Sequence, residues 1–212
     1  MTDHGEATTA NRGGGRRLDR SRDAAILRAA LEGLAELGYD RMSMDEIAAR
    51  AHSGKGALYR RWPSKAALVA DAIVAWRERV APIVAPNTGS LLGDIEALIE
   101  GAPDFGESDR RMLQVISGLA TAAARDPELR AAFKDQILER PRRMLREVLE
   151  RAVVRGEIPP QRVLELIPDV LISMNMLRIV LGEVPDREFF RRVFDEIIHP
   201  LVTAPSRRND GD

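Results

Sequence analysis

The chain has 212 residues and a formal net charge of −1, so it is long enough to bury a core without covalent staples, and its net charge favours no class of partner. The absence of cysteine excludes a disulfide framework and a thiolate metal site. We find no membrane span and no secretory signal, so we expect a cytoplasmic protein. Charged residues make up 31% and aromatic residues 4% of the chain, a balance that predicts an all-α fold.

The first part of the chain is predicted to contain a disordered arm and one long helix. Residues 1–20 are rich in Gly, Thr and Arg and lack an apolar period, so we expect them to be disordered. From Ile26 to Leu37 apolar residues recur at spacings of three and four, which predicts a helix, and Gly38 is a typical C-terminal stop.

Two short helices and a longer one are predicted next. Ser43, with Glu46 three residues later, forms a capping box that predicts the start of a helix of about two turns. Residues 52–54 interrupt this helix, and a second short helix follows and ends before Pro63. Ser64 is then placed to cap a long amphipathic helix that runs to about residue 80.

The rest of the chain is predicted to form a separate helical bundle with its own core. We expect Pro141 and Pro168 to kink or divide the helices that contain them, because proline lacks the backbone N–H and clashes with the preceding turn. The helices are expected near residues 90–100, 108–124, 127–155, 160–181 and 186–202.

The segment of residues 43–68 carries the main functional signal. Apolar residues of its two short helices would pack against the first helix, which leaves an outward face on the second short helix. A helix about 10 to 12 Å across fits a DNA major groove about 12 Å wide. Residues 1–65 also carry a charge of +3 and residues 66–212 a charge of −4, which supports nucleic-acid binding only beside such a motif. The outward residues are Lys55, Gly56, Ala57, Tyr59 and Arg60.

Over residues 22–70 the sequence resembles the DNA-binding half of the tetracycline-repressor (TetR) family. The joint spacing of the residues that match is specific, although each short motif alone is common. This sequence departs from the family pattern at residues 52–54, where Gly-Val-Ser is usual, and at Ala57, where Thr is frequent. The matching residues are Gly38-Tyr39, Ser43, Ile47-Ala48, Ala51, Lys55-Gly56, Leu58-Tyr59, Trp62, Ser64-Lys65 and Leu68.

This resemblance implies a homodimeric regulator with a helix-turn-helix head over residues 21–65, a ligand-binding and dimerisation body over 66–204 and a disordered tail over 205–212. It implies phosphate contacts for Tyr59 and Lys65 and a backbone contact for Ser43. Base-edge contacts are expected from Lys55 and Ala57. The arginines before the first helix form either an arm that reaches the DNA or a solubilising tail, and Arg22 is the expected contact among them.

Two sets of apolar residues in the body are candidate functional residues, and core packing is the alternative for each. The last two long helices have wide apolar faces, which suggests the subunit interface that the family resemblance implies. We assign this interface Leu164, Ile167, Leu171, Met174, Leu181, Phe190, Phe194, Ile197 and Leu201. We assign an effector pocket Trp76, Phe105, Met112, Ile116, Phe133, Ile137, Met144 and Met176.

The expected partners are an operator DNA duplex, a small-molecule effector and a second copy of the chain. The three histidines lack ligand-like spacing and no catalytic motif is found, so we expect no metal, no cofactor and no enzymatic activity. The alternatives are a helical adaptor that binds a protein through residues 160–202, and a small hydrolase or transferase.

Overall fold

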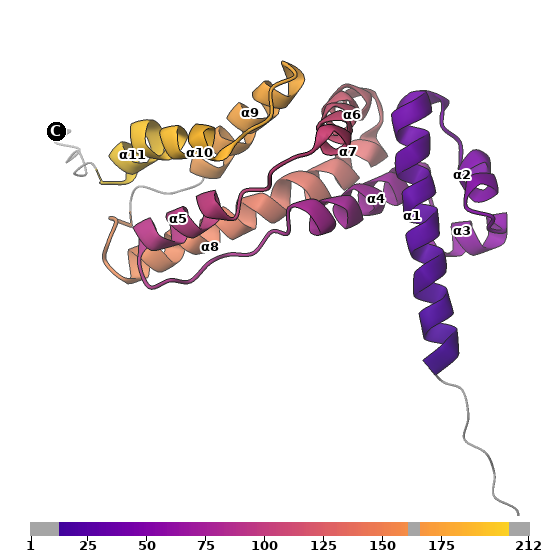
Figure 1. The fold of residues 1–212 in the computed structure, drawn as a ribbon, viewed down its shortest axis with the longest axis horizontal. Helices are drawn as coiled ribbons and strands as arrows, with labels where there is room; N and C mark the ends of the chain where they lie inside the picture. The colour runs from indigo at the N-terminus through magenta and orange to yellow at the C-terminus, as the bar shows by residue number, and fades with distance from the viewer. Residues whose placement is uncertain (1–12, 161–165, 204–212) are drawn as a thin grey trace, which may run out of the picture.

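We describe a computed structural model of the chain, which covers residues 13–160 and 166–203. These residues form helices joined by short loops, which confirms the predicted all-α fold (Figure 1). The first four helices are α1 (Gly13–Arg41), α2 (Met44–Arg50), α3 (Lys55–Arg61) and α4 (Lys65–Val80).

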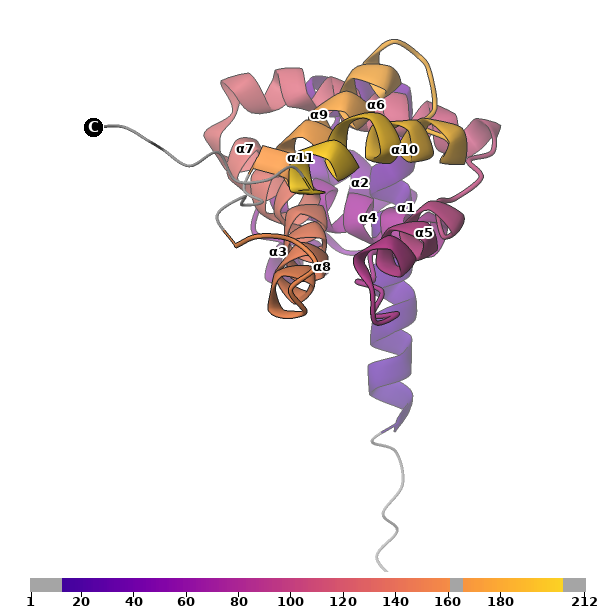
Figure 2. The same ribbon diagram turned by 90° about the vertical axis from the view of Figure 1, so that its left-hand side faces the viewer.

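The second part of the chain contains longer helices interrupted by two π-helical turns, η1 and η2. The elements are α5 (Leu91–Glu100), α6 (Glu107–Arg125), α7 (Pro127–Phe133), η1 (Lys134–Glu139), α8 (Arg140–Val154), α9 (Leu166–Val180), α10 (Arg187–Val193), η2 (Phe194–Ile198) and α11 (His199–Thr203). Helices α10 and α11 lie over α5 and α8, at the end of the molecule remote from α2 and α3 (Figures 1 and 2).

Helix α1 begins at Gly13, which corrects the prediction that residues up to 20 are disordered. Residues 1–12 of the predicted arm lie outside the described residues. Arg and Leu are good helix formers, so a helix nucleated by the buried segment after residue 25 extends readily through residues 16–20, whereas each glycine of residues 13–15 opposes it by about 1 kcal/mol. The predicted stop is confirmed, because Gly38 has φ 74° and breaks the helix before a final turn.

The buried residues form two cores, and their division differs from the prediction. One core joins α1–α4 to α6, α7 and η1, so the helix-turn-helix segment shares its core with part of the body. The other core lies among α5, α8, α9 and the α10–α11 segment. The predicted separate core therefore covers only the remote half of the body, because α4 carries apolar residues on both sides of its axis.

Each of the two π-helical turns lies directly before a helix that contains a proline near its start, and only one of the two is predicted. Proline removes an N–H from the helix interior. The α-helix changes to the wider π-helical turn η1 immediately before Arg140 and Pro141. The predicted perturbation at Pro141 is thus confirmed. Pro168 lies in the first described turn of α9 and does not divide it. The π turn η2 precedes Pro200 in the same way, a break that the sequence analysis does not predict.

Candidate nucleic-acid interface

The capping box predicted at the start of α2 is present in full. The Ser43 hydroxyl accepts from the Glu46 N–H at 3.2 Å, and the Glu46 carboxylate accepts from the Ser43 N–H at 2.9 Å. Ile47 and Ala48 are buried on the side of α2 that faces α1. A helix of only seven residues is therefore held by its cap and its packing.

The turn between α2 and α3 depends on a left-handed residue at position 52. His52 has φ 48°, and its N–H donates to the Ala49 carbonyl at 3.1 Å, while the Ser53 N–H donates to the Ala48 carbonyl at 2.9 Å. These two bonds form a Schellman motif, in which glycine normally takes the left-handed position. The departure from the family's glycine is therefore accommodated without a change of turn geometry.

The substitution His52→Gly is expected to stabilise the protein by about 1 kcal/mol. Glycine adopts this left-handed backbone conformation without the clash between Cβ and the backbone that other residues incur. Thermal unfolding should show a midpoint raised by about 2–4 °C. His52 is exposed, so the substitution removes little packing. An unchanged or lowered midpoint would contradict the strain that we assign to this residue.

Helix α3 has a polar outward face, and Leu58 packs its other side into the core. Leu58 is fully buried, whereas Lys55, Gly56, Tyr59 and Arg60 are exposed. At about 100° per residue, positions 55, 56, 59 and 60 fall within an arc of about 140° around the helix axis, and Leu58 lies outside this arc. The outward orientation predicted for these four residues is confirmed, and Ala57 is half-buried beside them.

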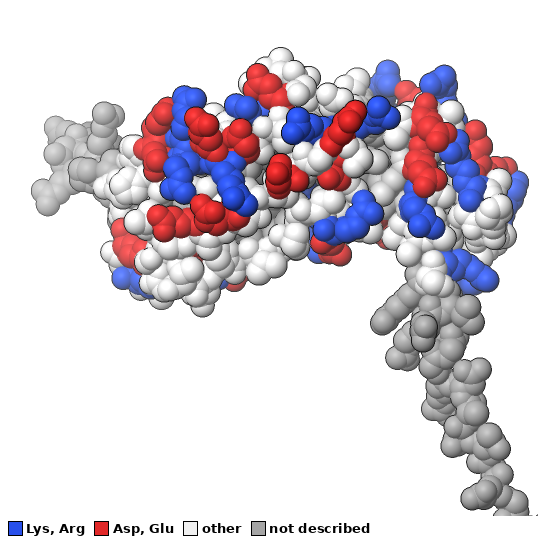
Figure 3. Space-filling view, in the orientation of Figure 1, with Lys and Arg blue, Asp and Glu red and all other residues white. Residues whose placement is uncertain are grey.

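Two ion pairs fix the ends of α3 to the neighbouring helices. Lys55 Nζ lies 2.6 Å from Asp45 Oδ2 of α2, with both side chains largely exposed. Arg61 Nη1 lies 2.7 Å from Asp23 Oδ1 of α1, and the Arg61 side chain is mostly buried. On the face of the molecule shown in Figure 3, basic and acidic side chains are interspersed and form no large basic patch.

Gly56 has no steric reason within the described part of the molecule to be glycine. A Cβ built at this position meets no atom within 4 Å. Glycine in a helix costs roughly 0.5–1 kcal/mol relative to alanine. A glycine on the exposed face of α3 therefore suits the close approach of a partner's surface.

The Lys65 side chain bonds to the C-terminal end of α1. Its ammonium group donates to the carbonyls of Tyr39 at 2.7 Å and Met42 at 3.1 Å, and it lies 4.2 Å from the centre of the Tyr39 ring. Tyr39 lies in the last turn of α1 and Met42 directly after it, where carbonyls lack donors from within the helix. The phosphate contact predicted for Lys65 stays a prediction, whereas its cap on α1 is visible.

The two remaining predicted DNA contacts are exposed, and one of them also has a local role. Arg22 lies on the exposed surface of α1. The Ser43 hydroxyl is already engaged with Glu46, to which it also donates at 2.9 Å. The backbone contact predicted for Ser43 would therefore be made while the hydroxyl retains this cap.

Sequence reasoning missed the joint between α1 and the body. The Tyr39 hydroxyl donates to Asp126 Oδ2 at 2.8 Å, and Asp126 also accepts from the Leu129 N–H at the start of α7. Burial and the Asp126 carboxylate raise the pKa of Tyr39, while the Leu129 N–H and the Tyr39 hydroxyl lower the pKa of Asp126. Arg125 and Asp40 pair beside it at 3.1 Å.

A second joint connects α4 to the π turn before α8. Arg77 Nη1 donates to the Ile137 carbonyl at 3.1 Å, and burial lowers the pKa of this arginine. The helical donor for that carbonyl would be residue 141, which is a proline without an N–H. Glu78 and Arg140 pair next to it at 2.9 Å. Helix α4 is therefore fixed to both parts of the molecule.

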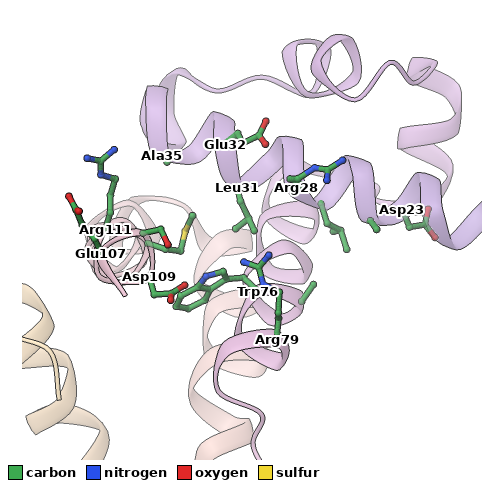
Figure 4. Close-up of a pocket in the computed structure, with 15 residues that line it drawn as sticks. Asp23, Arg28, Leu31, Glu32, Ala35, Trp76, Arg79, Glu107, Asp109 and Arg111 are labelled. Carbon is green, nitrogen blue, oxygen red and sulfur yellow. The ribbon is translucent and has the colours of Figure 1, made fainter. Parts of the chain in front are cut away.

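Most of the predicted pocket residues are core residues. Ile116, Phe133 and Ile137 are buried in the first core, Phe105 and Met176 pack against it, and Met144 packs against the second. Only Trp76 and Met112 line a cleft of about 880 Å³, which opens between α1, α4 and α6 (Figure 4). The sequence could not distinguish these cases, because apolar core and pocket residues have the same spacing.

The predicted interface residues divide between the monomer core and the surface. Ile167 and Phe194 are buried in the second core, which corrects their assignment, and Leu171, Met174, Phe190 and Ile197 are half-buried and pack against it. Leu181 and Leu201 are exposed, and Leu164 lies outside the described residues. Leu166, Leu177 and Val180 of α9 are exposed as well.

Neither a metal site nor a membrane span is found within residues 13–160 and 166–203. No group of three His, Asp or Glu side chains there is arranged to hold a metal ion. No helix in the same ranges has the length and apolar character needed to cross a membrane.

The arrangement of α1, α2 and α3, with an anchored and outwardly polar third helix after a tight turn, defines a helix-turn-helix DNA-binding protein. Comparison with known proteins specifies the family. Residues 26–72 match the model of bacterial regulatory proteins of the tetR family, and residues 85–197 match the tetracyclin repressor-like C-terminal domain. The chain belongs to the TetR family, and it is a transcriptional regulator with a helix-turn-helix DNA-binding domain.

Individual relatives agree with this assignment. The HTH-type transcriptional regulator Rv1556 of Mycobacterium tuberculosis is 32% identical over 86% of this chain and 88% of its own. The DNA-binding transcriptional repressor TetR of Mycobacteroides abscessus is 33% identical over 88% of this chain and 97% of its own. Both relatives are named as transcriptional regulators.

Solved structures share the fold. The TetR family transcription regulator SCO0332 has a TM-score of 0.63 at 23% identity and covers 87% of this chain and 100% of its own. Salmonella enterica GusR has a TM-score of 0.62 at 19% identity, with 87% of this chain and 96% of that chain covered.

Proposed function

We propose that the protein is a repressor that binds a palindromic operator as a homodimer and is released by a small molecule. The observation that carries the proposal is the outward face of α3, where Lys55, Gly56, Tyr59 and Arg60 are exposed on a helix that Leu58 anchors. A helix with this face fits the major groove, with Lys55 at base edges and Tyr59 and Arg60 at phosphates. The other proposed contacts are Arg22, Ser43, Ala57 and Lys65.

The exposed apolar side of α9 supports the homodimer. Leu177, Val180 and Leu181 are each about two-thirds exposed on the monomer surface, and Leu201 of α11 is 45% exposed. Contiguous apolar residues on a surface mark an interaction site. A twofold interface here places one helix-turn-helix head on each side, as a palindromic operator requires.

Helix α4 is the proposed link between effector and DNA. It begins with Lys65 on the carbonyls that end α1, and near its other end Arg77 bonds to the Ile137 carbonyl. We place the head at residues 21–65 and the effector-binding and dimerisation body at residues 66–204. An effector that prefers one orientation of α4 lowers DNA affinity by its differential affinity for the two orientations.

The direct experiment selects bound duplexes from random DNA with the full-length protein. We expect a palindrome whose half-sites are separated by about one helical turn, roughly 10 base pairs. The matched control carries Tyr59→Ala and Arg60→Ala, which alter exposed residues and leave Leu58 in place. If the wild-type protein enriches no palindrome, the operator proposal is wrong and a protein-binding adaptor becomes the better explanation.

Gly56→Ala is expected to separate stability from DNA binding. The alanine should stabilise α3 by roughly 0.5–1 kcal/mol, because it lowers the cost of helix formation and no atom within 4 Å opposes its methyl group. Operator affinity should nevertheless fall, because the methyl group occupies the space between α3 and the DNA. Thermal unfolding and operator titration test the two effects, and unchanged operator affinity would contradict the proposed close approach.

A further inference from the structure

The cleft between α1, α4 and α6 has walls from both parts of the molecule. Helix α1 belongs to the helix-turn-helix head, α6 belongs to the body and α4 connects them. Its volume of about 880 Å³ lies within the range of roughly 300–1,000 Å³ that small-molecule sites occupy. Figure 4 shows Trp76 and Asp109 lying in the space between the three helices.

The floor of the cleft is apolar and includes a large aromatic ring. Trp76 is 5% exposed, and half-buried Leu27, Leu31 and Met112 surround it. Exposed Ala35 and Ala75 line the walls, and their small side chains leave the volume open. An indole at the floor of an open cleft suits a flat molecule that stacks or packs against the ring.

The rim of the cleft is charged but balanced. Asp23 is already paired with Arg61 at 2.7 Å. The other charged lining residues are three arginines and three carboxylates, so the rim offers hydrogen-bonding groups of both signs without net charge. They are Arg28, Arg79, Arg111, Glu32, Glu107 and Asp109. Such a rim favours a ligand that is itself without net charge, either neutral or zwitterionic.

We propose that this cleft binds a flat small molecule with no net charge, and that its occupation is coupled to DNA binding. The coupling, but not the binding itself, rests on the proposed repressor function. Contacts to α1 and α6 change when the head moves relative to the body, so the bound molecule has different affinities for different head orientations. The DNA-bound and ligand-bound states then influence each other reciprocally.

The cleft lies between the same two helices that the joint connects. Tyr39 and Asp40 at the end of α1 bond to Asp126 and Arg125 at the C-terminal end of α6. The cleft is lined by earlier residues of the same two helices, from Asp23 to Ala35 and from Glu107 to Met112. A ligand there fills the space between two helices that are already joined near their other ends, which restricts how the head can turn about the joint.

The test uses the uncharged dye Nile red with the full-length protein, and anionic 1-anilinonaphthalene-8-sulfonate and cationic ethidium as comparators. Nile red should bind saturably, with one cleft site per chain, and more tightly than either charged dye. Ala75→Phe and Ala35→Phe fill the cleft from different walls, and each should weaken binding by about tenfold or more. The matched control is Ala124→Phe, an exposed alanine of α6 outside the cleft.

Circular dichroism melting establishes that each variant is folded, and the two filling variants serve as independent tests. Undiminished Nile red binding in the folded filling variants, or preferential binding of a charged dye, would overturn the proposal. A second titration compares Nile red affinity with and without a duplex selected from random DNA, and we expect a severalfold change. Equal affinities would overturn the coupling, whereas failure of the repressor function itself appears earlier, as the absence of any selected duplex.

Discussion

Replacing Leu177 and Leu181 together by glutamate is expected to convert the dimer into folded monomers and to weaken operator binding by roughly 10²–10⁴-fold. Both side chains are largely exposed in the monomer, so the change costs its fold little. In the proposed dimer they are buried against the partner, where unpaired carboxylates are strongly unfavourable. Loss of the second linked head removes the gain in affinity that bivalent attachment provides.

Sedimentation velocity gives the oligomeric state, and titration of a selected operator gives the affinity. Leu92→Glu is the matched control, because Leu92 is also more than half exposed but lies on α5, which contributes no residue to the proposed interface. The control should remain dimeric and bind the operator normally. A Leu177 and Leu181 variant that stays dimeric would place the interface on another surface.

Lys55→Ala is expected to cost about 1–3 kcal/mol of operator affinity and to relax specificity at the base that the lysine contacts. The fold should tolerate the change, because the ion pair with Asp45 is exposed and such pairs contribute little to stability. Selection from random DNA with the variant should therefore return the same half-site with one position less defined. A uniform loss across all sequences would instead indicate a phosphate contact.

Asp45→Asn is the informative companion substitution. In the free protein the Lys55 ammonium lies 2.6 Å from the Asp45 carboxylate, and it must exchange this partner for the DNA. Removal of the carboxylate eliminates that competition and a repulsive charge near the phosphates, so operator affinity should rise. Reduced affinity of this variant would mean that Asp45 holds Lys55 in its binding position.

The helix-turn-helix segment could be predicted from the sequence because its signals are local. The capping box needs only Ser43 and Glu46, and the turn between the two short helices needs only residues 52–54. Both are confirmed by hydrogen bonds within a few residues. The burial of Ile47, Ala48 and Leu58 followed from helical spacing alone.

Features that depend on distant residues could not be predicted in this way. Spacing identified apolar stripes on α9 but could not show that Ile167 faces its own core while Leu177 faces outward. The Tyr39–Asp126 bond joins residues 87 positions apart, and the Arg77–Ile137 bond spans 60. The contact between Lys65 and the carbonyls near the end of α1 could not be predicted either, because every residue has a backbone carbonyl and the sequence does not show which of them a lysine will reach.

The salt dependence of operator binding, compared between the wild-type protein and Arg60→Ala, tests most directly whether the outward face of α3 meets the DNA. Each phosphate contact contributes about 0.9 to the slope of log affinity against log salt. One such contact in each of two heads predicts a slope shallower by about 1.8 in the variant. An unchanged slope, with the variant folded and dimeric, would contradict the contact between this face and the phosphate backbone.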